Sequence, residues 1–140
     1  MEQTKMAEIP AKMDEVMLNL RFSQQQYRQL VTQLQVVEGM KAQLIMDGYE
    51  PWVSQDYNLT TQLKMIRNYS IPAYKRRITD SEELLLQNNI TDIGKHQRYD
   101  LLPYLQRELV DLLAGQKEDL DLLQKIHQEI QPFMPKGYQP

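Results

Sequence analysis

The chain has 140 residues, the size of one domain, with 41% hydrophobic residues, 25% charged residues and a formal net charge of -3. Frequent Leu, Ile, Val, Met and Tyr exclude a disordered tail. We expect no membrane span, since no uncharged apolar run approaches the ~20 residues that cross a bilayer. The absence of cysteine excludes a disulfide framework, a thiol nucleophile and cysteine-ligated zinc.

The beginning of the chain carries no signal for secretion. Residues 1–20 include four acids and no uninterrupted apolar stretch, so we expect a cytoplasmic protein. The alternative is an extracytoplasmic domain of a larger protein. Three N-x-[ST] sequons, which begin at Asn58, Asn68 and Asn89, are weak evidence for that alternative without a secretory signal.

The strongest pattern is a heptad repeat in the first third of the chain. Positions spaced alternately three and four residues apart are mainly apolar, namely Met6, Ile9, Met13, Val16, Leu20, Ser23, Tyr27, Leu30, Leu34, Val37, Lys41 and Leu44. Pro10 suits a first helical turn and Gly48 suits a C-terminal cap. The pattern therefore predicts a helix over 10–47, about 57 Å long.

Further apolar residues flank this seam and widen the stripe, namely Met17, Phe22, Val31, Val36, Met40 and Ile45. A wide stripe is typical of a helix that packs against at least two others. We therefore expect partner helices of matching length.

A second helix is predicted over about 52–87. A turn precedes it, Pro51 can open it, and its apolar positions fall near one face, namely Trp52, Leu59, Leu63, Ile66, Ala73, Ile78 and Leu85. Pro72 removes a backbone hydrogen bond, so the helix either bends near 68–72 or ends and restarts. We favour one bent helix.

A third helix is predicted from Tyr99 or Asp100 to about residue 132. Its 3–4 spacing runs over Leu102, Leu105, Leu109 and Leu112 and resumes over Leu120, Leu123, Ile126, Ile130 and Phe133. We expect a register shift around 114–116. A helical Gly115, which costs ~1 kcal/mol relative to Ala, gives three helices, whereas a turn at Gly115 gives four.

The near-equal lengths of the predicted helices favour three helices over four. The expected fold is all-α, an elongated antiparallel bundle of three long helices, with four helices as the alternative. We expect a single helical-bundle domain over 1–140 with a non-helical tail over 132–140, either a linker or a docked arm. No strand is expected.

Charge is unevenly distributed along the chain. Residues 64–77 contain five bases and no acid, whereas residues 100–129 contain seven acids and three bases. We expect the two segments to face each other, although each exposed pair contributes only ~0–1 kcal/mol. The overall negative charge argues against a general nucleic-acid binder.

No motif indicates catalysis, a cofactor or a metal. Asp92, His96 and Asp100 are spaced by four residues, but Gly94 interrupts them, so a solvated turn between helices is favoured over a metal site. His127 stands among apolar residues with no carboxylate one turn before it. We expect no enzyme and no cofactor, and an enzyme would have only these two histidines to use.

Two clusters are candidates for contact with a partner. Trp52, with Tyr49 and Tyr57, forms either an aromatic anchor or, as we favour, a plug at the end of the bundle. Lys75, Arg76 and Arg77 form either a patch for an anionic partner or, as we favour, residues that pair with the acidic third segment or are simply solvated.

The sequence thus predicts a non-enzymatic protein–protein interaction or scaffolding bundle, with a protein partner or self-association. The alternative is a ligand-sensing bundle excised from a membrane receptor. Only this alternative implies a small molecule, held by Arg67, Tyr74 and Arg77 near the bend. Nucleic acid is not an expected partner.

Overall fold

The computed structural model describes residues 2–48, 52–54, 57–91 and 101–138, and the side chains of 13–48, 59–86 and 101–138. Its elements are α1 (Glu2–Met46), β1 (Trp52–Ser54), β2 (Tyr57–Asn58), α2 (Leu59–Met65), the π-helix η1 (Ile66–Ser70), α3 (Ile71–Thr91), α4 (Leu101–Ile130) and the 3₁₀ turn η2 (Gln131–Phe133). The expected all-α bundle is confirmed, and α4 runs through Gly115, which favours three long helical rods over four.

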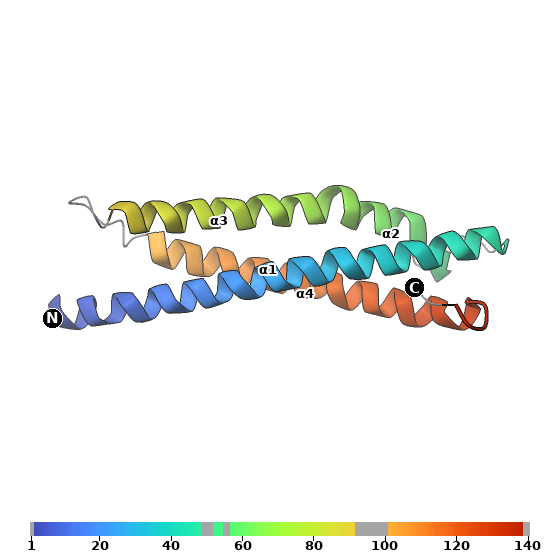
Figure 1. Ribbon diagram of the computed structural model, residues 1–140, viewed down its shortest axis with the longest axis horizontal. Helices are drawn as coiled ribbons and strands as arrows, with labels where there is room; N and C mark the ends of the chain where they lie inside the picture. Colours follow the sequence, from blue (N-terminus) through green and yellow to red (C-terminus); the bar gives the residue numbers. More distant parts are fainter. Residues whose placement is uncertain (1, 49–51, 55–56, 92–100, 139–140) are drawn as a thin grey trace.

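The three rods lie side by side in an elongated molecule (Figure 1). The rod formed by α2, η1 and α3 runs antiparallel to both others, so α1 and α4 are parallel. α1 packs more extensively against α4 than against α3. In the part of the chain that the structure describes, no helix is long and apolar enough to span a bilayer.

The first rod begins earlier than expected. α1 starts at Glu2, so Pro10 lies inside the helix and not in its first turn. At ~1.5 Å per residue its 45 residues span about 67 Å. Its other end is as predicted, because Gly48 has φ +86° and its N–H donates to the carbonyl of Ile45 at 3.0 Å.

The second rod begins later than expected, at Leu59 and not at Trp52. β1 pairs antiparallel with β2 across Trp52–Asn58 and Ser54–Tyr57, so the expectation of no strand was wrong for this short hairpin. Trp, Val and Tyr favour extended backbone, and here they follow Pro51, which explains why the helix does not start at once.

The seam between α1 and α4 forms most of the core. On α4 the buried positions are Leu102, Leu105, Leu109, Leu112, Gln116, Leu123, Ile126 and Ile130. The alternating spacing passes through Gln116 and half-buried Asp119 without a break. The expected register shift around 114–116 was therefore wrong, because two polar residues occupy seam positions there.

Gln116 anchors α4 to α1 inside the core. Its side chain is 0% exposed, and its Nε2 donates to the backbone carbonyl of Ser23 at 3.0 Å. The Ser23 hydroxyl, also buried, donates to the carbonyl of Leu20 at 2.7 Å. Sliding α4 along α1 would break the bond from Gln116 and leave its amide buried without a partner, so this contact favours one axial register.

The bend expected at Pro72 is a π turn. The N–H of Ile71 donates to the carbonyl of Ile66, five residues back. Pro72 lacks an N–H and its ring crowds the preceding turn, and a wider turn relieves both effects without ending the helix. The second rod therefore continues from Leu59 to Thr91 as one interrupted helix.

The π turn also inserts one residue into the apolar pattern. Before it Leu59, Leu63 and Ile66 are buried, and after it Tyr74, Ile78, Ser81 and Leu85 are buried. Unbroken 3–4 spacing from Ile66 would instead turn Ala73, Arg77 and Asp80 toward the core. Ala73, which was predicted to fall near this face, is half-buried for this reason, and Tyr74 takes the buried position.

The end of the chain folds back on the bundle. Half-buried Met134 and Tyr138 pack against the core. A Cβ added to Gly39 on α1 would lie 3.3 Å from the Tyr138 hydroxyl oxygen, so the tail approaches α1 closely. Of the two possibilities for the tail, the docked arm fits the described residues.

The π turn predicts that the two long rods tolerate a deletion differently. In a Pro72→Ala background, where an ordinary turn meets no proline ring, deleting exposed Asn68 converts the π turn into an ordinary turn and keeps Tyr74 and Ile78 in the core, at a cost below about 2 kcal/mol. Deleting exposed Glu118, by contrast, rotates Leu123 and the later core positions away from α1 and costs at least about 4 kcal/mol. Urea denaturation followed by circular dichroism measures both, and equal losses would contradict the explanation.

Candidate functional site

Of the six predicted partner-binding residues, the structure describes the side chains of three, Lys75, Arg76 and Arg77. Tyr49 lies outside the described residues, and Trp52 and Tyr57 lie in β1 and β2, where their side chains are not described. Lys75 and Arg76 are exposed on α3 and have no ion pair within the described ranges.

Arg77 is half-buried and pairs with α4. Its Nε donates to Glu108 Oε1 at 2.5 Å and its Nη2 to Asp111 Oδ2 at 2.9 Å. Partial burial lowers the pKa of Arg77, but the hydrogen bonds to both carboxylates outweigh burial and raise this pKa overall. The expectation that the basic segment faces the acidic one is confirmed here. It was wrong for Arg67, whose Nε donates to Glu38 of α1 at 2.6 Å.

Tyr74 is held in the core by a carboxylate. Its side chain is 8% exposed and its hydroxyl donates to Asp119 Oδ2 at 2.6 Å. Burial, followed by the hydrogen bond to Asp119, raises the pKa of Tyr74. Arg67, Tyr74 and Arg77, the residues of the ligand-sensing alternative, thus each bind a different carboxylate of the bundle.

Gly115 makes room for the Tyr74 ring. A Cβ at this position would lie 3.2 Å from the Tyr74 hydroxyl oxygen and 3.6 Å from the nearest ring carbon. Any larger residue at 115 therefore presses on a buried ring that is tethered to Asp119. This packing explains a glycine in the middle of a 30-residue helix.

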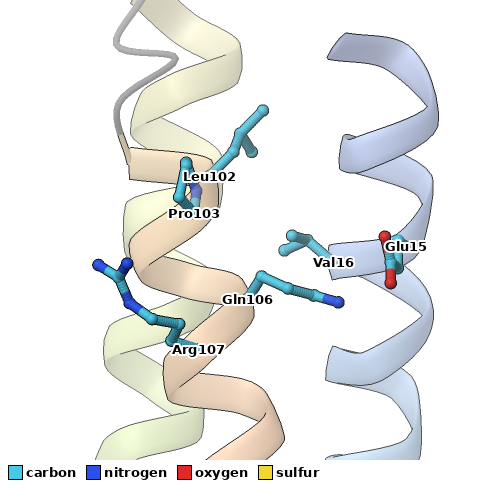
Figure 2. Close-up of a pocket in the computed structure, with 6 residues that line it drawn as sticks. All are labelled: Glu15, Val16, Leu102, Pro103, Gln106 and Arg107. Carbon is cyan, nitrogen blue, oxygen red and sulfur yellow. The ribbon is translucent and has the colours of Figure 1, made fainter. Parts of the chain in front are cut away.

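A groove of about 270 Å³ lies between α1 and the first turns of α4. Figure 2 shows Val16 pointing from α1 toward α4 and Gln106 reaching from α4 toward α1, with Arg107 directed away. Glu15, Leu102 and Pro103 complete the lining. Below it Asn19 Nδ2 donates to Gln106 Oε1 at 3.1 Å and links the two helices. The groove thus combines an apolar floor with charged rims.

A second groove, of about 400 Å³, lies between α1 and α3. It is lined by Gln24, Tyr27, Arg28, Lys75, Ile78, Thr79 and Glu82. Lys75 belongs to the predicted basic cluster. Arg28 was not identified from the sequence, because no other base lies close to it along α1. The groove brings these two cations together from segments far apart in the chain.

The histidines do not form a recognisable centre in the described residues. His96 lies outside them, and half-buried His127 lines a shallow groove with Gln29, Gln33, Leu120 and Gln124. Within the described ranges, no three residues of the His, Cys, Asp and Glu types lie close enough to hold a metal ion.

Comparison with known protein families, curated proteins and solved structures finds no match for this chain. Its function must therefore be argued from the two grooves and the surfaces around them.

The contact between Gly115 and Tyr74 predicts a coupled effect of two substitutions. In the natural background, Gly115→Ala should lower the free energy of unfolding by about 1 kcal/mol, because the added methyl disturbs the hydrogen bond to Asp119. In a Tyr74→Phe background the close oxygen is gone, and the same change should stabilise by up to about 1 kcal/mol through helix propensity. Urea denaturation of the four proteins gives the coupling. Additive effects would contradict the contact.

Proposed function

We propose that this protein is a non-enzymatic protein-interaction module that binds an amphipathic helix of a partner protein along residues 13–22 of α1. The observation that carries the proposal is the apolar surface of this stretch. Met17, Leu18 and Phe22 are large apolar side chains, yet they are 37%, 47% and 44% exposed. Leu18 and Phe22 are one helical turn apart and share a face of α1, whereas Met17 lies off that face. Neighbouring exposed apolar residues of this kind are typical of interaction sites, whereas scattered ones are ordinary.

The adjoining groove supports the proposal. Val16 and Leu102 supply an apolar floor next to this stretch, and Glu15 and Gln106 add polar groups to the lining. An amphipathic helix binds such a groove through apolar residues on one face and polar residues beside them. The geometry thus suits a helical ligand.

The seam of α1 extends further than that of α4. The groove and the bond from Asn19 place this part of α1 beside the first turns of α4. α1 nevertheless continues back to Glu2 and projects beyond the start of α4 (Figure 1). A partner helix that binds along residues 13–22 therefore has room to continue along this projecting part of α1.

Site-specific cross-linking tests the proposal. A photoreactive amino acid replaces Leu18 in one variant and Val110 in a control, since Val110 is a 53% exposed apolar residue on α4. In cells that make the protein, we expect a discrete adduct from position 18 only. The captured protein is then purified and titrated with the unmodified chain by calorimetry.

In that titration Leu18→Glu should raise the Kd at least about tenfold, because it places a charge in an apolar contact. Val110→Glu should leave the Kd nearly unchanged. Equal adducts from both positions, or a Kd insensitive to Leu18→Glu, would refute binding along residues 13–22. An adduct of twice the chain mass would identify the partner as a second copy.

A further inference from the structure

Two segments without acidic residues lie side by side in the bundle. Residues 16–37 of α1 contain no Asp or Glu, and neither do residues 59–79 of the second rod. The Arg67–Glu38 pair joins them at one end, and the α1–α3 groove joins them near Arg28 and Lys75. A chain of net charge -3 thus has one face that is locally basic.

The bases of these segments differ in their partners. Arg67 pairs with Glu38 of α1, and Arg77 turns away from this face and pairs with Glu108 of α4. Arg28 and Lys75 are exposed and have no ion pair among the described residues. Neither has an acid three or four residues away on its own helix. Their charges are therefore available to a ligand.

The other groove residues suit an acidic peptide. An Arg guanidinium and a Lys ammonium bind carboxylates through charge-assisted hydrogen bonds. Gln24 and Thr79 add polar groups, and buried Ile78 gives an apolar floor. Glu82 is the one acid in the lining, seven residues beyond Lys75 on α3, so it leaves the end near the two cations positive.

We propose that the α1–α3 groove binds an acidic segment of a partner protein, with its carboxylates on Arg28 and Lys75 and an apolar side chain over Ile78. A duplex nucleic acid is less favoured, because such complexes neutralise roughly 6–10 phosphates, whereas this groove offers two cations. The groove shares no residue with the α1–α4 groove or with residues 17, 18 and 22, so this proposal and the proposed function can fail separately.

Fluorescence anisotropy with a labelled peptide of Glu-Glu-Leu repeats tests the inference. The test variant is Arg28→Gln with Lys75→Gln, and the charge-matched control is Lys117→Gln with Lys136→Gln, at exposed positions of α4 and the tail. Losing two charge-assisted bonds should raise the Kd of the test variant at least about tenfold. The control should change it less than about twofold.

Four further results decide the outcome. A peptide of Gln-Gln-Leu repeats should not bind, and Leu18→Glu should leave the Kd of the acidic peptide unchanged. Equal weakening in the test and control variants would show unspecific attraction and overturn the proposal. Tighter binding of an oligonucleotide than of the peptide, lost in the same test variant, would overturn it in favour of nucleic acid. Circular dichroism melts check that both double variants remain folded.

Discussion

The apolar seam between the parallel helices α1 and α4 is the contact on which the rest of the structure depends. Leu105, Leu109 and Leu112 of α4 are fully buried against it, and the bond from Gln116 to Ser23 favours one axial register. That register sets Gln106 beside Asn19 and creates the groove above them. The second rod packs on this pair and has to adapt to it, which its π turn does by moving Tyr74 and Ile78 into the core.

The distribution of charge follows from the same arrangement. α4 carries six acids against three bases and faces the second rod, where its carboxylates engage Arg77 and the hydroxyl of Tyr74. Lys75 lies on another side of α3, next to the acid-free part of α1, in a groove whose lining has Glu82 as its one acid. An acidic helix on one side of the bundle therefore permits a basic groove on the other. The surface exposed along residues 13–22 of α1 differs in kind, because it is apolar.

The fold was largely predictable because apolar periodicity in α1 and α4 is strong, whereas the details that shape the candidate sites depend on single residues. The π turn left a signal, a one-residue offset between Ile66 and Tyr74, but Pro72 suggested a simple bend. Gln116 was not predicted to lie in the core, because a polar residue at a seam position interrupts the apolar repeat. Arg28 was not found because its importance comes from Lys75, which is distant in sequence and adjacent only after folding. The interaction sites themselves remain proposals.

The parallel arrangement of α1 and α4 also has a consequence for how the chain reaches this structure. The contacts that tie these helices together join residues far apart in sequence, as the separations of 87 residues for Asn19–Gln106 and 93 for Gln116–Ser23 show. On a ribosome, the apolar stripe of α1 stays partly uncovered until α4 has been made, with only the second rod to cover part of it. Helical bundles usually fold quickly through local contacts, but the dominant interface here is non-local. The newly made chain therefore passes through a stage in which its longest helix is exposed to other proteins, including those that assist folding.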